Sequence, residues 1–146
     1  MKSGFRKIMV ILALGALLCL TACESELSGQ KREAVLSFSE AITDNMLAGL
    51  AANDYQLFSR DFDQNMLKVL PVSRFAAWKA EMDEMIGACS SREVERVTRA
   101  DEFYVVTYQV ECAKASHVTV EIAFNGNSHT IDHLSFHSDS LTLVSQ

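Results

Sequence analysis

The feature that most limits how this sequence can fold is a single change of hydrophobic period at Gly87. Before it, apolar residues recur every three or four positions, which is typical of amphipathic helices. After it, apolar and polar residues alternate, which is typical of half-buried strands. Helices followed by strands predict an α+β fold, with the N-terminal helices packed on one face of an antiparallel sheet. The 146 residues leave room for one domain.

The helical half is predicted to begin with one long helix over residues 30–52. It is expected to end near Asn53, a residue type that tolerates the left-handed conformation at a helix end. Its apolar face is expected to consist of Val35, Phe38, Ile42, Met46, Gly49 and Leu50.

Two further helical segments are predicted between residues 54 and 87. Asp54 can cap the first of them, which Ser59 and residues 61–63 are expected to break into two pieces. Pro71 is expected at the first position of the last helix, and Gly87 at its end.

The strand half is predicted to form four antiparallel strands, with residues 141–144 as an optional fifth. Residues 92–99 are charged enough for an edge strand, and residues 104–112 and 118–124 alternate cleanly. Asn125-Gly126 is a strong hairpin signal before the next strand, residues 131–136. The spacing from Ile131 to Leu134 breaks the alternation and predicts a β-bulge near Asp132 and His133.

The N-terminal segment is predicted to be an export signal. Residues 1–22 contain Lys2, Arg6 and Lys7 and then the apolar run 8–20, which is too short for a comfortable membrane span of about 20 residues. Leu20-Thr21-Ala22-Cys23 resembles the lipobox of bacterial lipoproteins, in which the cysteine is acylated and becomes the mature N-terminus. The alternative is an ordinary cleaved signal followed by an incidental cysteine. In the lipoprotein pattern, Glu24 in place of Asp favours the outer membrane, with the domain facing the periplasm.

The predicted organisation is a signal peptide at residues 1–22, a lipidated N-terminus with a flexible tether at residues 23–31, and one domain at residues 32–146. Loss of the three basic signal residues leaves 10 of the 13 Lys and Arg against 19 Asp and Glu, a net charge of −9. An acidic body without a basic cluster is not expected to bind nucleic acid or to lie on anionic headgroups. The predicted membrane contact is the acyl group on Cys23.

Core and turn residues of the mature chain form a pattern that resembles a known family. The pattern consists of Asp54-Tyr55, Phe58, Phe62-Asp63, Met66, Leu70-Pro71, Phe75, Trp78, Ile86-Gly87 and Tyr104-Val105-Val106. It resembles a family of small bacterial domains of unknown function in the nuclear transport factor 2-like group, over residues 33–137. The resemblance implies a cone-shaped, cystatin-like α+β fold. The group includes both enzymes and binding proteins, so the resemblance does not select an activity.

Four cysteines divide between the signal and the domain. Cys19 lies in the signal and Cys23 in the lipobox, which leaves Cys89 and Cys112. A hairpin that turns at residues 100–102 places these two nearly opposite each other, and export favours their oxidation to a disulfide. The alternative is two buried free thiols, because two cysteines supply only half the ligands of a zinc site.

Three histidines at a spacing of four residues invite a metal-site interpretation. His129, His133 and His137 would share one face of a helix, but the surrounding pattern predicts a strand. On a straight strand they would span about 27 Å, and the bulge moves His137 off the face of His129. We therefore predict no metal site. No nucleophile motif or nucleotide-binding loop is present in the sequence, and no cofactor is expected.

The predicted helix-facing side of the sheet is nearly all apolar. Its members are Tyr104, Val106, Tyr108, Val110, Val118, Val120, Ile122 and Phe124. Tyr104 and Tyr108 are its only polar residues and, with Phe75 and Trp78, they are the candidate pocket residues.

Two classes of function stay open. The favoured one is a non-enzymatic binding or interaction module with an unidentified protein or small-molecule partner, because chemistry needs a positioned acid, base or nucleophile. The alternative is a small-molecule receptor or enzyme that uses a pocket between helices and sheet. A cavity of about 300 Å³ or more with convergent polar groups would favour the alternative. A closed core lined by Phe38, Phe75, Trp78, Val106 and Ile122 would favour the first.

Overall fold

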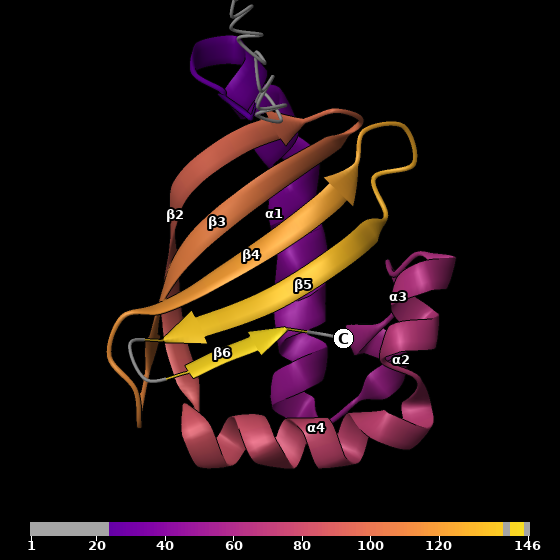
Figure 1. The fold of residues 1–146 in the computed structure, drawn as a ribbon, viewed down its shortest axis with the longest axis vertical. Helices are drawn as coiled ribbons and strands as arrows, with labels where there is room; N and C mark the ends of the chain where they lie inside the picture. Colours follow the sequence, from indigo (N-terminus) through magenta and orange to yellow (C-terminus); the bar gives the residue numbers. More distant parts are fainter. Residues whose placement is uncertain (1–23, 139–140, 145–146) are drawn as a thin grey trace, which may run out of the picture.

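The computed structural model describes residues 24–138 and 141–144 and shows an α+β fold, as predicted (Figure 1). The helices are α1 (Gly29–Ala52), α2 (Tyr55–Phe58), α3 (Gln64–Val69) and α4 (Val72–Met85). The strands are β1 (Ser25–Glu26), β2 (Cys89–Ala100), β3 (Phe103–Cys112), β4 (Val118–Asn125), β5 (Ile131–Ser138) and β6 (Leu141–Val144). The helices therefore precede all the strands except β1, which was not predicted.

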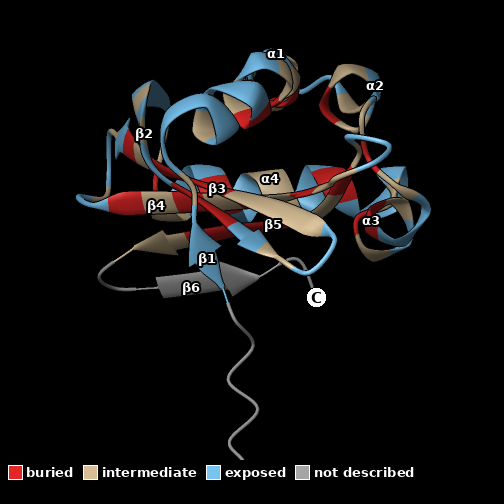
Figure 2. Cartoon of the chain, turned by 90° about the horizontal axis from the view of Figure 1, so that it is seen from above, coloured by how far each residue is buried: buried red, intermediate tan, exposed pale blue. Residues whose placement is uncertain are grey.

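The strands form one antiparallel sheet in the order β1-β2-β3-β4-β5-β6. All four predicted strands are present, and β6 supplies the optional fifth. α1 runs along one face of the sheet, and α4 crosses the end of the molecule opposite the entry of the chain (Figure 1). Buried residues gather between the helices and the sheet (Figure 2). The predicted helix-facing residues of β3 and β4 from Val106 to Phe124 are buried, which confirms their orientation.

The buried face of α1 differs from the prediction, and Leu50 is one of the predicted members that is only partly buried. Ser39 and Thr43 are fully buried, whereas Phe38 and Ile42 are only partly buried. Gly49 belongs to this face because a Cβ there would lie 2.2 Å from the backbone nitrogen of Phe58. Small and polar side chains therefore let α1 approach both α2 and the sheet closely, a requirement that hydrophobic periodicity alone does not reveal.

The helix ends follow the predicted caps with one shift. Asn53 ends α1 with a φ of 55°, and Asp54 Oδ1 accepts hydrogen bonds from the backbone N–H groups of Gln56 and Leu57. The predicted break occurs after Phe58, and Asp63 caps α3 by accepting from the Met66 N–H at 2.7 Å. Pro71 lies one position earlier than predicted, at the N-cap of α4.

The β4–β5 connection lies where it was predicted but is longer than a two-residue turn. The loop covers residues 126–130, and the Asn125 side chain accepts hydrogen bonds from the N–H groups of Asn127 and Ser128. His129, not Gly126, adopts the positive φ. The predicted bulge is confirmed, because Ala123 pairs with His133 and Phe124 with Ile131, which leaves Asp132 between them.

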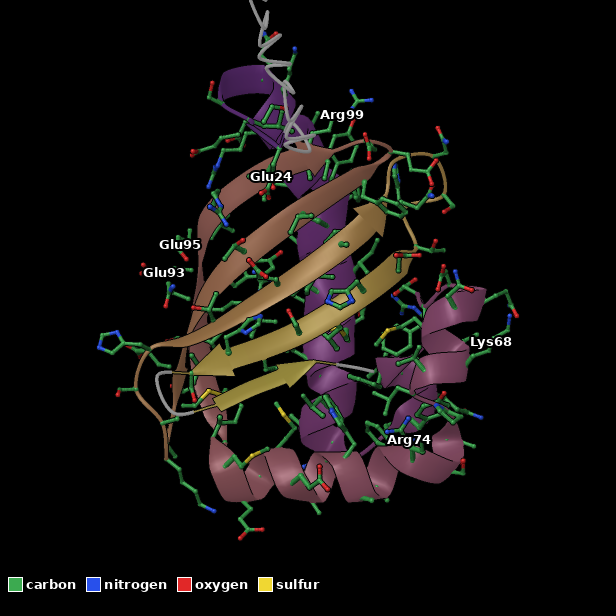
Figure 3. All side chains as sticks on the ribbon, viewed as in Figure 1. Glu24, Lys68, Arg74, Glu93, Glu95 and Arg99 are labelled. Atoms are coloured by element: carbon green, nitrogen blue, oxygen red, sulfur yellow. A yellow bond between two sulfur atoms is a disulfide. The ribbon has the colours of Figure 1, made fainter. Side chains whose placement is uncertain are left out.

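Residues 24–28 differ from the expected flexible tether. Ser25 pairs with Arg99 and Glu26 with Thr98, and the Leu27 N–H donates to the Val97 carbonyl at 2.8 Å. Thr98 Oγ1 also donates to Glu24 Oε1 at 2.7 Å. This pairing satisfies backbone groups that β2 would otherwise expose at the edge of the sheet. Glu24, the residue after Cys23, is thereby held at the end of the sheet that also carries Arg99 (Figure 3).

Candidate functional site

A cavity of about 460 Å³ lies between α1, α4 and the sheet. α1 contributes residues from Asp44 to Ala51, α4 contributes residues from Lys79 to Asp83, and β2 closes the end with residues 89–92. The apolar lining includes Leu47, Leu50, Met82, Ile86, Val110 and Phe136. Its volume falls within the range of small-molecule sites, which is about 300–1,000 Å³. We refer to this space as the α1–α4 cavity.

Charged side chains lie among the residues that line the α1–α4 cavity. Lys79 Nζ is 2.6 Å from Asp83 Oδ2, and one terminal nitrogen of Arg92 is 2.6 Å from Asp44 Oδ1. In both pairs the cation is the better buried member. The Lys79 side chain is 15% exposed and that of Asp83 58%. The Arg92 side chain is 14% exposed and that of Asp44 69%. The cavity is therefore apolar inside, with two partly shielded positive charges at its edge.

Arg92 is held by more than its pair with Asp44. Its other terminal nitrogen donates to Glu40 Oε2 at 2.8 Å, and its guanidinium lies 4.8 Å from the centroid of the Tyr108 ring. Burial alone would lower the pKa of Arg92, but the hydrogen bonds to Asp44 and Glu40 outweigh it and raise the pKa above its ordinary value. The guanidinium is therefore charged at every accessible pH and fixed in direction.

Tyr108 lies inside the domain, as predicted, but its hydroxyl is already engaged. It donates to Glu40 Oε1 at 2.9 Å and lies 3.1 Å from Thr43 Oγ1. Burial raises the pKa of the Tyr108 hydroxyl, which keeps it neutral. Tyr108 is therefore suited to positioning Glu40, which in turn positions Arg92. It is not suited to accepting a proton.

The other candidate pocket residues pack in or against the core and do not line the α1–α4 cavity. Phe75 and Trp78 both pack on Phe58, with ring centroids 4.9 and 5.7 Å apart. Tyr104 is half-buried beside Phe38 at 6.4 Å, and Arg99 lies over its ring. None of the four candidates lines the cavity.

The cavity residues that sequence reasoning missed leave a recoverable signal. Arg92 and Val94 pair with Val110 and Tyr108 of β3, which places both on the helix-facing side of β2. The charged composition of residues 92–99 predicts an edge strand and does not by itself indicate which of its side chains face the helices. Two spacings in the sequence carry the signal. Arg92 and Val94 are two residues apart, which places them on the same face of a strand, and Lys79 and Asp83 are four apart, which allows an ion pair on a helix.

The two domain cysteines meet at the β2 end of the cavity. Cys89 and Cys112 are register partners, and their sulfur atoms are 2.05 Å apart, which is the distance of a disulfide bond. Cys89 also belongs to the cavity lining. The predicted cross-link would therefore fasten one wall of the site.

The three histidines are dispersed. The His129 ring stacks on Phe38 with centroids 3.8 Å apart, and His133 is exposed on β5. His137 Nε2 lies 3.0 Å from Ser135 Oγ and 3.7 Å from Glu121. Within residues 24–138, no group of three His, Cys, Asp or Glu side chains has the geometry to hold a metal ion.

A second polar cluster lies where β5 meets α3. Burial raises the pKa of the Asp132 carboxyl, and the hydrogen bond and charge of neighbouring Asp63 raise it further. Asp63 is already committed to capping α3. The pair is therefore structural, and its effect is on the pH dependence of stability.

Searches against protein-family models, curated proteins and solved structures find no match for this chain. In the part of the chain that the structure describes, α1 is the longest helix, and neither it nor any other helix combines the length and hydropathy that crossing a membrane requires.

Proposed function

We propose that this protein is a membrane-anchored lipoprotein whose domain binds a small amphipathic molecule in the α1–α4 cavity. The observation that carries the proposal is the cavity itself, with 460 Å³ of space, mostly apolar walls and charged groups at the edge. Apolar walls hold the body of a ligand, and a few polar groups fix its orientation. This arrangement favours a receptor over a module that only contacts other proteins.

The exposed surface supports the same preference. Among the residues whose burial is described, Val72 is the only large hydrophobic side chain that is exposed. Protein interaction sites are commonly marked by larger apolar patches. The apolar surface that this domain offers to a partner lies mainly in the cavity.

We also propose that the domain binds its ligand without catalysis, because the groups that line the cavity are better suited to holding a ligand than to transferring protons. Lys79 and Asp83 pair with each other, and Arg92 pairs with Asp44 and Glu40. Cys89 is at bonding distance from Cys112 and so is not offered as a nucleophile. A catalytic group would need a free base or acid aimed at a reacting atom.

We further propose that the fold is the cone-shaped, cystatin-like form of the nuclear transport factor 2-like group. Helices that cover one face of an antiparallel sheet and leave a hollow at one end support this assignment. It rests on the residue pattern described above.

The anchor is proposed to be an acyl group on Cys23 in the outer membrane, with the domain in the periplasm. The support is the lipobox, together with Glu24 as the next residue. Because Glu24 is bonded to Thr98, a lipid on Cys23 would bring the β1 end of the sheet to the bilayer. The cavity lies at the other end, since Asp44 is about 22 Å along α1 from Gly29. Glu24 and α4 lie toward opposite ends of the molecule (Figures 1 and 3). The site would then face the periplasmic space.

Ligand binding is tested by thermal unfolding of the full protein in nanodiscs with decanoate, decanol or decyltrimethylammonium, because a ligand that binds only the folded state raises the Tm. We expect at least one of the three to raise it. Ala48→Trp places a bulky side chain at the cavity wall and should abolish the rise, whereas Ala34→Trp, on α1 but outside the lining, should retain it. No rise with any of the three, or an unchanged rise in Ala48→Trp, would overturn the proposal.

The anchor is tested separately. Globomycin treatment or Cys23→Ala should block maturation and membrane retention. A mature protein that fractionates as soluble with an unmodified N-terminus contradicts the assignment of Cys23.

A further inference from the structure

We propose that the α1–α4 cavity selects an amphipathic carboxylate and that Arg92 is the residue that recognises its carboxylate group. This inference rests on the proposed function and adds the chemical class of the ligand. The Arg92 side chain is 14% exposed at the cavity edge, and its terminal nitrogens carry two carboxylate contacts of different kinds. One contact holds the guanidinium, and the other can be exchanged for a ligand.

The holding contacts are those with β3 and with the middle of α1. Glu40 Oε2 accepts from Arg92 at 2.8 Å, the Glu40 carbonyl accepts at 3.4 Å, and the Tyr108 ring supports the guanidinium plane. Glu40 is itself fixed by the Tyr108 hydroxyl, which bonds Thr43 as well. These contacts keep Arg92 in place when its remaining partner leaves, which is the preorganisation that tight binding needs.

The exchangeable contact is that with Asp44. Asp44 is 69% exposed and reaches Arg92 through a single oxygen at 2.6 Å. Because solvent already screens the exposed Asp44 carboxylate, its replacement by a ligand carboxylate costs little. A ligand carboxylate bound from inside the cavity forms a shielded, charge-assisted hydrogen bond with the same nitrogen, which is stronger.

The positive charge of Lys79 on the opposite wall also favours an anionic ligand. Lys79 is 15% exposed and also pairs with a more exposed acid, Asp83. Both cations therefore lie deeper than their acidic partners. A charged group bound inside the cavity would therefore lie nearer to Arg92 and Lys79 than to the exposed carboxylates of Asp44 and Asp83, which favours an anion over a cation.

The body of the ligand is inferred to be aliphatic. The walls are formed by branched and flexible side chains such as Leu47, Met82 and Ile86, with Val110 and Phe136 behind them. Each methylene buried there should tighten binding by about fourfold until the cavity is full. Because the cavity lies at the end of α1 remote from Glu24, we expect the free carboxylate, and not the acyl chain of an intact membrane lipid, to be the ligand.

The test is calorimetric titration of the full protein in nanodiscs, with empty nanodiscs subtracted. Hexanoate, octanoate and decanoate should bind with rising affinity, and decanoate should bind tighter than decanol and decyltrimethylammonium. Phospholipid vesicles without free fatty acid should not compete with decanoate. Competition by the vesicles would transfer the site to a membrane lipid and overturn the free-ligand inference.

Two substitutions with matched controls separate recognition from folding. Arg92→Met should weaken decanoate binding roughly tenfold or more and leave decanol unchanged, while Arg96→Met, on the same strand but outside the cavity lining, should change neither. Asp44→Asn removes the competing anion and should tighten decanoate binding about two- to fivefold. Its control is Glu81→Gln, exposed on α4 and outside the lining, which should have no effect. Asp44 is exposed, so this variant keeps the test valid even where Arg92→Met fails to fold.

The failures of the two proposals are distinguishable. If decanoate and decanol bind equally and neither Arg92→Met nor Asp44→Asn changes the ratio, the carboxylate inference is wrong and the binding cavity remains. If decyltrimethylammonium binds best and Asp44→Asn weakens it, the site selects cations and the inference is also wrong. If none of the compounds binds, both the carboxylate inference and the proposed function are wrong.

Discussion

The two ends of the space beneath the helices are built differently. At the closed end, beneath α2–α4, Phe58 packs against the rings of Phe62, Phe75 and Trp78 at centroid distances of 4.9, 4.9 and 5.7 Å. At the hollow end, between α1, α4 and the start of β2, 460 Å³ is left unfilled. Phe136 marks the boundary, since it touches Trp78 and lines the cavity. Aromatic side chains fill one end, and short or aliphatic side chains leave the other open.

The comparison indicates that one end of the core stabilises the domain and the other end provides space for a ligand. The closed end supplies the dense packing that stabilises the domain. The hollow end gives up packing and holds its walls by other means, namely the Cys89–Cys112 link and the network of Arg92 with Glu40 and Tyr108. Substitutions at the two ends should therefore have separable effects on stability and on binding.

The largest expected effect is at the closed end. Phe58→Ala removes a ring that is 1% exposed and should lower the free energy of unfolding by about 3–5 kcal/mol. Leu47→Ala, in the partly solvated cavity wall, should cost about 1 kcal/mol and weaken ligand binding instead. Urea unfolding measures both costs. Equal costs would contradict the division into a closed and a hollow end.

The disulfide comes next. The two cysteines are 23 residues apart in the sequence, and the loop-entropy model gives about 3 kcal/mol of stabilisation for a cross-link of that span. Double Cys→Ala substitution or reduction should lower the urea midpoint accordingly. Because Cys89 lines the cavity, ligand affinity should fall as well. Two free thiols in the isolated protein, found by non-reducing mass spectrometry, would contradict the cross-link.

A matched pair of buried hydroxyls on α1 tests the polar network. Thr43→Val takes one partner from the Tyr108 hydroxyl and should cost about 1 kcal/mol. Ser39 is equally buried, but its hydroxyl has no hydrogen-bond partner among the residues that the structure describes, so Ser39→Ala should be neutral or stabilising. Thermal unfolding of both variants checks the contrast. A destabilised Ser39→Ala with an unaffected Thr43→Val would show that the network is assigned to the wrong hydroxyl.

The smallest expected effect concerns pH at the contact of β5 with α3. The folded-state pKa of Asp132 is raised above 3.8, chiefly by burial and then by Asp63, so the folded state binds more protons than the unfolded state above that pH. Its contribution to stability is therefore lost as the pH rises through the raised pKa. Asp132→Asn should flatten this fall and, because solvent screens a carboxyl that is only partly buried, gain no more than about 0.5 kcal/mol at neutral pH. The free energy of unfolding of both proteins, measured from pH 4 to pH 8, tests this prediction. An Asp132→Asn variant with the same pH dependence as the wild-type protein would contradict the raised pKa of Asp132.

The sequence predicted the architecture well because periodicity and capping are local properties. The switch at Gly87, the cap at Asp54 and the bulge at Asp132 all follow from residues within a few positions of one another. Residues 61–63 were expected only to break the helix, and the role of Asp63 as the cap of α3 was not predicted. The longer loop after Asn125 and the pairing of residues 25–26 with β2 were not predicted, because other elements contribute to both: the Gly126 N–H donates to the Glu102 carbonyl, and β1 pairs with β2. Pro71 was expected at the first helical position and lies at the N-cap.

The candidate site was much less predictable. Tyr108 was correctly placed on the helix-facing side, but its partners Glu40 and Thr43 lie 68 and 65 residues away in the chain. A hollow is a property of how side chains from several elements fail to meet, and no local pattern records it. The aromatic residues Phe75 and Trp78, chosen for the pocket, fill the closed end because large rings pack most favourably against one another.

The most direct test of the central claim is methyl NMR of the protein titrated with decanoate. The account predicts shifts concentrated on Leu47, Met82, Ile86, Val110 and Val120 around the cavity, with the methyl groups of Val97 and Ile131, both outside the lining, unchanged. The Ala48→Trp variant should lose those shifts. No shifts in the wild-type protein, or shifts confined to residues outside the cavity lining, would contradict the claim that the hollow end of this domain is a ligand site.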